Sequence, residues 1–184
     1  LDLADRVLLD SQQDDLLNGL AQLNWQEQSP QQLHSLLKAL ENQALTELPE
    51  AQWLPRRARI DELLDTADLP HAWNAISALH SDSDLLLARA AKTLAGGCPL
   101  TGHLVWEQIK RAQKLSLADV FRMEYAMSLN CCRHPEFPEG VRSRLIDKDH
   151  APRWHWPDVA SIPQQVIDAH FAPAWDGAHP LADL

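Results

Sequence analysis

The sequence predicts a mainly α-helical protein with at most one short strand near its N-terminus. Apolar residues recur at three- and four-residue spacing, as in Leu16, Leu17, Leu20 and Leu23, which is the pattern of an amphipathic helix. Capping residues and Gly or Pro breakers separate such stretches at short intervals along the chain. We therefore expect several helices that pack through their apolar stripes and are joined by short loops.

Residues 5–9 (DRVLL) are the stretch most consistent with a strand. A lone strand cannot satisfy its own backbone N–H and C=O groups, and no second convincing strand follows it in the sequence. Two interpretations stay open. The strand pairs with a part of the protein outside this sequence, or these residues form a loop.

Helix starts and stops divide the chain from residue 11 onward. Ser29 and Pro30 open one helix, Ser83 is expected to cap another, and Gly96–Gly97 is expected to end that helix in a left-handed conformation. The helices expected in this part of the chain cover residues 14–23, 29–40, 60–69, 70–79, 84–94 and 99–114.

Two serine boxes mark the last two helices. Ser116 with Asp119 resembles a capping box and starts the longest helix, and Ser161 with Gln164 starts a short helix that ends near Phe171. The residues that the longest helix is expected to direct toward the core are Val120, Phe121, Tyr125, Leu129 and Cys132.

Composition excludes several classes of protein. The 184 residues carry a formal net charge of −10, which argues against a nucleic-acid partner because phosphate binding needs an excess of Lys and Arg. No apolar run has the length of a membrane span, so we expect no membrane partner. The chain has three cysteines, two of them adjacent, which indicates a reducing cytosol and predicts a cytoplasmic protein.

Common catalytic and metal-binding motifs are lacking in the sequence. Cys131, Cys132 and His134 lie close together, with His150 and His155 downstream, but adjacent helical cysteines point about 100° apart and make a poor tetrahedral pair. We expect no metal site. No activated serine or cysteine motif and no phosphate-binding glycine loop is present either.

One acid and one basic cluster each allow two interpretations. Glu124 is either a buried acid with a shifted pKa or, more often for such a residue, part of an ion pair with Arg122, Arg142 or Arg144. Farther along, a basic cluster interrupts an otherwise acidic chain. It is either a surface network neutralised by neighbouring acids, or a lysine held by its neighbours to meet an anionic ligand with a tryptophan as anchor. The cluster and its neighbours are Arg142, Arg144, Asp147, Lys148, Asp149, Arg153 and Trp154.

The region around this cluster resembles the C-terminal signature of the 3-hydroxyisobutyryl-CoA hydrolases, a branch of the enoyl-CoA hydratase/isomerase (crotonase) superfamily. The matching residues are Met123-Glu124-Tyr125, Phe137 and the segment EGVRSRLIDKDHAPRW, residues 139–154. A weaker match at Leu3-Ala4-Asp5 resembles the "GLADH" that closes the core of that family, with Asp2 for Gly and Arg6 for His.

The resemblance implies a helical C-terminal subdomain of a crotonase-like fold. Residues 1–10 then end the crotonase-type core, and residues 11–184 form a helical lid and assembly region. It also implies that the glycine-rich oxyanion hole and the catalytic acids lie in an N-terminal core outside this segment, so we expect the segment alone to be inactive. The residues it suggests for contact with coenzyme A or for anchoring the lid are Glu139, Arg142, Asp147, Lys148 and Trp154, and Glu139 could equally pair internally with Arg142.

The activity implied by the resemblance is hydrolysis of an acyl-CoA thioester in valine catabolism, with the thioester as substrate and no cofactor. The implied partners are the N-terminal core, the acyl-CoA and possible further copies of the chain. Two alternatives remain: hydratase or isomerase activity of the whole protein, or a stand-alone helical interaction module without catalysis.

Overall fold

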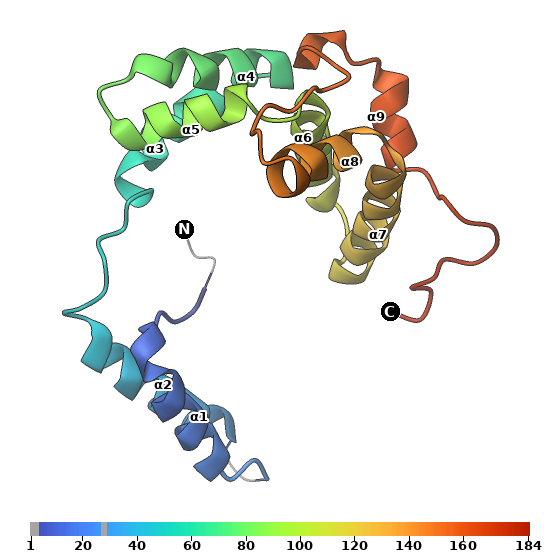
Figure 1. The fold of residues 1–184 in the computed structure, drawn as a ribbon. Helices are drawn as coiled ribbons and strands as arrows, with labels where there is room; N and C mark the ends of the chain where they lie inside the picture. Colours follow the sequence, from blue (N-terminus) through green and yellow to red (C-terminus); the bar gives the residue numbers. More distant parts are fainter. Residues whose placement is uncertain (1–3, 27–28) are drawn as a thin grey trace. The chain divides into compact units, whose positions relative to one another are not determined.

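The computed structural model describes residues 4–26 and 29–184 and contains only helices and loops in these ranges, which confirms the predicted mainly α-helical class (Figure 1). The chain divides into two compact units, Leu1–Ile60 and Asp61–Leu184. Within the described ranges, no helix is long and apolar enough to cross a membrane. The helices are η1 Asp10–Gln12, α1 Gln13–Gln22, α2 Ser29–Ala44, η2 Leu54–Arg56, α3 Arg57–Leu64, α4 Leu69–Ser77, η3 Ala78–Ser81, α5 Leu85–Ala95, α6 Pro99–Ala112, α7 Leu117–Arg133, α8 Glu136–Val141, η4 Arg142–Ile146, η5 Val159–Ser161 and α9 Gln164–His170.

The first unit is built on a hairpin of α1 and α2. Gly19 allows the two helices to approach closely, because a Cβ at this position would lie 2.6 Å from Leu36 Cδ1. The side chain of Gln12, which is 8% exposed, donates to the Leu40 carbonyl at 2.9 Å and accepts from the Leu9 N–H at 3.0 Å. The hairpin therefore fixes the chain that enters α1.

Of the two interpretations of residues 5–9, the structure of this chain agrees with the loop. These residues form an irregular segment, and Arg6 joins it to α2 through an ion pair with Glu41. No strand is present among the described residues, so within them the segment has no neighbour with which to form a ladder, and pairing with a part of the protein outside this sequence stays a prediction. The resemblance at Leu3-Ala4-Asp5 falls partly outside the described residues.

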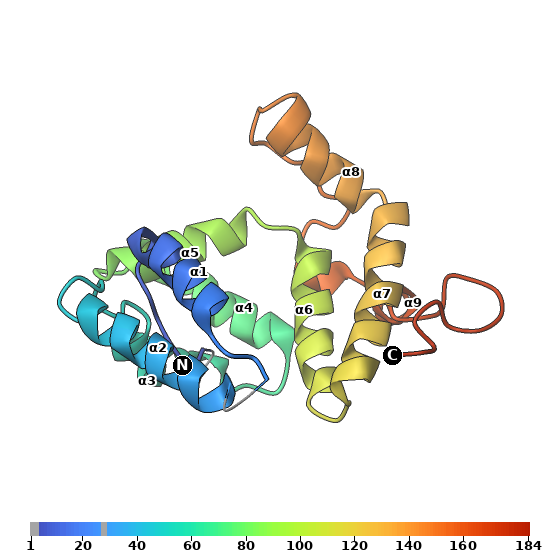
Figure 2. The same ribbon diagram turned by 90° about the horizontal axis from the view of Figure 1, so that it is seen from below.

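In the second unit, α4 and α5 lie side by side, and α6 and α7 form a second helical pair (Figures 1 and 2). The main core lies where α6 meets α7, η5, α9 and the loops around them. Partly buried apolar residues, including Met127 of α7 and Phe171 after α9, pack against it. The buried residues of this cluster are Leu100, Leu104, Ile162 and Ile167.

Two of the predicted helix caps are wrong. Asp84 rather than Ser83 caps α5, because its carboxylate accepts from the N–H groups of both Leu86 and Leu87, at 3.0 and 3.4 Å. Ser161 does not cap α9; it ends η5, and its N–H donates to Asp158 at 2.8 Å.

The left-handed stop predicted at Gly96–Gly97 is also wrong. Gly96 has φ −89° and ψ −2°, which is a right-handed conformation, because the last turn of α5 tightens and the Gly96 N–H bonds to the carbonyls of Lys92 and Leu94. Gly97 likewise has no positive φ.

The capping box at Ser116 is confirmed, since its hydroxyl accepts from the Asp119 N–H at 3.1 Å. The expected core face of α7 is only partly right. Val120 and Leu129 are half-buried, whereas Phe121 and Tyr125 are 49% and 39% exposed and Cys132 is exposed; the residue of α7 that is buried is Ala126. Tyr125 instead packs on Trp175 of the C-terminal tail, with ring centroids 5.5 Å apart.

The crossing of α4 and α6 depends on Gly102. A Cβ at this position would lie 2.7 Å from Cζ3 of Trp73. We expect Gly102→Ala to lower the free energy of unfolding by about 1–3 kcal/mol, the usual cost of overpacking, despite the better helix propensity of alanine. Gly96→Ala is the matched control, because its Cβ would meet nothing closer than 3.8 Å. Urea unfolding checks the pair, and equal stabilities of the two variants would contradict this prediction.

Candidate functional site

The candidate site is centred on Arg142, at the junction between α8 and the π-helix η4. Glu139 lies three residues earlier, so both side chains share one face of the helix. Arg142 donates from Nε and Nη2 to the two carboxylate oxygens of Glu139, at 2.9 and 2.8 Å. The expected internal ion pair between Glu139 and Arg142 is therefore present, in bidentate form.

Arg142 also holds the loop that follows η4. Its Nη1 donates to Asp147 at 2.6 Å and to Asp149 at 2.7 Å, and its Nη2 donates to the Ala151 carbonyl at 3.2 Å. We call Glu139, Arg142, Asp147 and Asp149 the arginine clamp. Each nitrogen of the guanidinium is engaged within the clamp, so Arg142 is positioned to order this loop rather than to bind an external phosphate.

The clamp perturbs the pKa values of its members in the expected directions. Hydrogen bonds from Arg142, and then from the Arg153 N–H, lower the pKa of Glu139 to about 2. The Ala151 N–H, and then Arg142, lower the pKa of Asp149 to about 2. The carboxylates in turn raise the pKa of Arg142 above its usual range. Glu139, Asp149 and Arg142 are therefore charged at neutral pH.

Lys148 stands at the tip of the clamped loop. Lys148 and His150 have φ of 55° and 52°, a left-handed conformation that costs a residue with a Cβ about 1–2 kcal/mol. The clamp offsets this cost because it fixes the acids on both sides of Lys148. Lys148 is exposed, and none of the described residues forms an ion pair or hydrogen bond with its ammonium group. This group is therefore accessible to a ligand from solvent.

Trp154 anchors the end of the segment. Its indole Nε1–H donates to the Gly96 carbonyl at the end of α5, at 3.3 Å, and its six-membered ring lies next to Gly140 on α8, within 3.5 Å of where a Cβ would stand. The interpretation of Trp154 as a packing anchor thus agrees with the structure, while its contact with coenzyme A stays a prediction.

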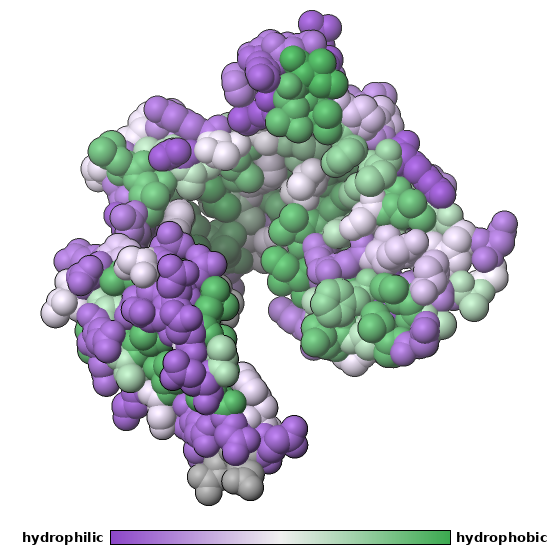
Figure 3. Space-filling view, turned by 60° about the horizontal axis from the view of Figure 1, so that its bottom comes forward, coloured by the Kyte–Doolittle hydropathy of each residue, from purple (hydrophilic) through white to green (hydrophobic). Residues whose placement is uncertain are grey.

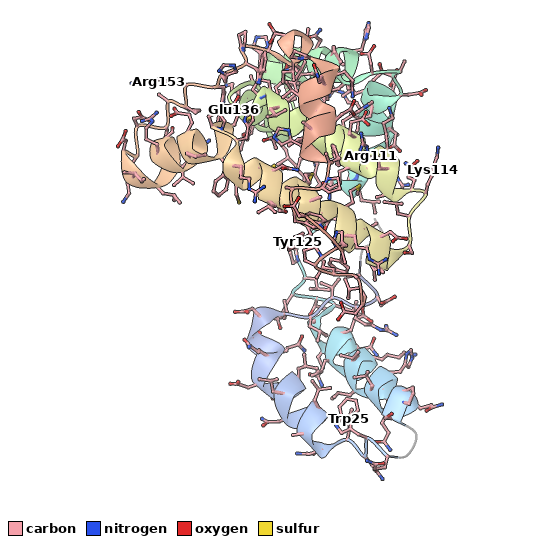
Figure 4. All side chains as sticks on the ribbon, turned by 90° about the vertical axis from the view of Figure 1, so that its right-hand side faces the viewer. Trp25, Arg111, Lys114, Tyr125, Glu136 and Arg153 are labelled. Atoms are coloured by element: carbon pink, nitrogen blue, oxygen red, sulfur yellow. The ribbon has the colours of Figure 1, made fainter. Side chains whose placement is uncertain are left out.

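Sequence reasoning missed Glu136, which is 7% exposed and begins α8. Its two carboxylate oxygens accept from the His155 N–H at 3.1 and 3.2 Å, and Figure 4 shows it near the extended segment that carries Arg153. The two partners are 19 residues apart, so no local spacing in the sequence indicates the pair. The contact between Glu136 and His155 therefore joins the start of α8 to the chain that follows the clamped loop.

Residues 136–155, which we call the clamp segment, line a cavity of about 450 Å³ together with residues of α6, α7 and α9. Most of its lining side chains are apolar, and Phe137, Leu145 and Trp154 come from the clamp segment itself. The remaining lining residues come from the start of α6, the end of α7, α8, η4 and the end of α9: Cys98, Leu100, Thr101, Leu104, Cys131, His134, Glu136, Gly140, Val141, Arg144 and His170.

Two titratable groups in the cavity wall are shifted toward their neutral forms. Burial, and then the neighbouring His170 ring at 5.0 Å, lower the pKa of His134. Burial, and then the adjacent Cys132, raise the pKa of the Cys131 thiol, so Cys131 is a weak nucleophile. In the described ranges, no three His, Cys, Asp or Glu side chains converge as a metal site would require.

In the part of the chain that the structure describes, Glu124 forms no ion pair with any of the three arginines that the sequence suggested. It is half-buried on α7, and its carboxylate accepts from the Gln108 side chain of α6 at 2.6 Å. The arginine that was expected to pair with it from α7, Arg122, instead binds Asp119 and the carbonyls of the C-terminal tail. Glu124 therefore joins two helices and takes no part in the clamp.

Curated relatives match about half of this sequence. The chain is 37% identical over 94 residues to the mitochondrial 3-hydroxyisobutyryl-CoA hydrolase of Danio rerio, which covers 51% of this chain and 25% of that protein. It is 30% identical over 96 residues to the mitochondrial 3-hydroxyisobutyryl-CoA hydrolase of Homo sapiens, which covers 52% of this chain and 25% of that protein. The matched region spans about a quarter of the length of these relatives.

Solved structures show the same arrangement of helices. A carnitinyl-CoA dehydratase from Mycobacterium thermoresistibile matches 93% of this chain and 45% of its own, with a TM-score of 0.72 and 24% identity. An enoyl-CoA hydratase from Rhodobacter sphaeroides matches 77% of this chain and 42% of its own, with a TM-score of 0.61 and 26% identity. The enoyl-CoA hydratase/isomerase family model matches residues 1–171, and the chain therefore belongs to the enoyl-CoA hydratase/isomerase family.

Proposed function

We propose that the whole protein hydrolyses an acyl-CoA thioester of the 3-hydroxyisobutyryl type, a step of valine catabolism, and that this helical region covers its active site. The observation that supports the proposal is the arginine clamp. It lies within the segment whose sequence resembles the hydrolases, and it fixes a left-handed loop with an outward lysine. A loop of this kind is suited to hold a charged ligand in place.

Hydrolysis needs groups that we assign to a core outside this region. Attack on a thioester builds negative charge on the carbonyl oxygen, and one backbone N–H donor in an oxyanion hole stabilises it by roughly 3–4 kcal/mol. An acid or base must also move a proton or attack the acyl carbon. The proposed part of this region is to cover the acyl-CoA and to position its coenzyme, and on its own the region is expected to be inactive.

Lys148 is the residue that we assign to the coenzyme. Its ammonium group is presented without an internal partner among the described residues, and the phosphates of coenzyme A carry the complementary charge. Arg142 is assigned a positioning role, because its guanidinium is engaged by the clamp. Loss of a single exposed cation–phosphate contact is worth up to about 1 kcal/mol.

The test is Lys148→Ala in the whole protein, with Lys114→Ala as the control. Lys114 is a lysine of the same unit that follows α6, away from the clamp (Figure 4). We expect the KM for the acyl-CoA to rise roughly fivefold in Lys148→Ala and to stay unchanged in Lys114→Ala, with little change in kcat. The rise should shrink at high salt, because salt screens exposed charges. An unchanged KM in Lys148→Ala would remove the phosphate-contact role.

A hydratase activity is the second candidate, because the solved structures with this fold are a carnitinyl-CoA dehydratase and an enoyl-CoA hydratase. The two reactions differ in their products. Hydrolysis releases free coenzyme A, which a thiol reagent detects, whereas hydration retains the thioester. Release of thiol from a hydroxyacyl-CoA supports the first candidate, and conversion of an enoyl-CoA without thiol release supports the second.

A further inference from the structure

We infer that the cavity beneath the clamp segment is a binding site for a carboxylate with an apolar chain, such as a medium-chain fatty acid. The cavity of about 450 Å³ has the size of ordinary small-molecule sites, which are largely apolar and carry a few polar groups for orientation. This assignment concerns a free carboxylate and does not depend on the proposed hydrolysis.

The apolar part of the ligand has a defined place. Leu100 and Leu104 of α6 form one wall, and Phe137, Val141 and Leu145 of α8 and η4 form the other. Phe137 and Leu145 are 54% and 68% exposed, so this side of the cavity is open to a ligand from solvent. In Figure 2, α8 and η4 project from the rest of the second unit. In Figure 3, the corresponding projection at the top of the view carries a hydrophobic patch.

The charge of the ligand follows from the two charged residues in the lining. Among the lining residues that the structure describes, Glu136 is the one carboxylate, and both of its oxygens already accept from the His155 N–H. Arg144 is the one permanent cation; it is exposed, and no described residue forms an ion pair or hydrogen bond with its guanidinium. Glu136 is 7% exposed and lies in the wall, whereas Arg144 is exposed at the rim, so the charge that a ligand entering from solvent meets first is the Arg144 guanidinium. A guanidinium matches a carboxylate in bidentate geometry.

The histidines of the wall do not alter this assignment. Glu136 N–H lies 3.4 Å from His134 Nδ1, which accepts this contact in the neutral ring. His170 is 4% exposed, and its Nδ1 donates to the Val166 carbonyl at 2.8 Å. Burial lowers the pKa of His134, and the Nδ1 of His170 is taken by the Val166 carbonyl, so we assign the head group of the ligand to the rim beside Arg144.

The experiment titrates octanoate, octanol and octylamine into the purified 184-residue chain and follows the indole N–H of Trp154 by NMR. Trp154 lines the cavity and donates to Gly96, so an occupant changes its signal. We expect saturable binding of octanoate, much weaker binding of octanol and none of octylamine. In Arg144→Gln the affinity for octanoate should fall by about tenfold, because a charge-assisted hydrogen bond is lost.

Arg153→Gln is the matched control, since Arg153 is an exposed arginine of the same segment that does not line the cavity. Its affinity for octanoate should equal that of the unchanged chain. The proposal is overturned if octanoate does not bind at millimolar concentration, if octanol or octylamine binds as tightly, or if the two arginine variants behave alike. Because the readout is binding, these results leave the hydrolase proposal to its own test.

Discussion

In Arg142→Gln, cleavage of the chain after Lys148 by a lysine-specific protease is expected to be faster by roughly tenfold or more. The substitution removes hydrogen bonds to Glu139, Asp147 and Asp149, each of them charge-assisted, and charge-assisted bonds are the stronger class. The left-handed loop then loses the contacts that offset its conformational cost, and it opens far more often to the protease.

The matched control for this variant is Arg144→Gln, two residues along the same π-helix. Arg144 is exposed and lies outside the clamp, so its cleavage rate should match that of the unchanged chain. Equal cleavage of the two variants would show that the clamp does not order the loop. Hydrogen exchange at the Arg153 amide, which donates to Glu139 at 2.6 Å, gives a second reading of the same opening.

The pH dependence of the clamp follows from the lowered pKa values of its acids. Glu139 titrates at about 2 in the folded chain instead of 4.5, and Asp149 at about 2 instead of 3.8. A group with a lowered folded pKa stabilises the folded state fully above its unfolded pKa and loses this contribution as pH falls to the folded value. Loop protection should therefore be complete above about pH 4.5 and decline toward pH 2. In Arg142→Gln the folded pKa values of Glu139 and Asp149 should move back toward their unfolded values, so this pH dependence should become weaker.

Several local features were predictable from the sequence because short-range rules determine them. The three-residue spacing of Glu139 and Arg142 on one helical face indicated their ion pair, and the Ser116 capping box began α7 as expected. The apolar stripes gave the helices, since burial of one face is what stabilises an amphipathic helix. These features depend on residues that lie within one helical turn of each other, and such pairs can be recognised from the sequence alone.

The rest of the site depends on contacts between distant residues. Glu136 finds its partner at His155, and Trp154 finds its partner at Gly96, 58 residues away. No spacing rule gives such pairs. The error on α7 has the same long-range origin, because the tail residue Trp175 packs on Tyr125, which the pattern directed to the core. The wrong caps are local errors: Asp84 rather than the adjacent Ser83 caps α5, and Ser161 lies in η5, which Asp158 caps.

Ile167→Ala is expected to lower the free energy of unfolding of the second unit by about 2–5 kcal/mol. Ile167 lies on α9, is 1% exposed and packs in the cluster with Leu100, Leu104 and Ile162. Truncation removes buried methyl groups and leaves a cavity that α6 and η5 cannot fill without losing their own contacts. The loss is large beside a typical domain stability of roughly 5–15 kcal/mol.

The comparison for Ile167 is Gln165→Ala, an exposed position on the same helix, where the change should stay within about 0.5 kcal/mol. Urea unfolding followed by far-UV circular dichroism gives both values. Because α9 also contributes His170 to the cavity wall, Ile167→Ala should loosen the cavity as well as the core. Similar midpoints for the two variants would mean that α9 adds little to the core.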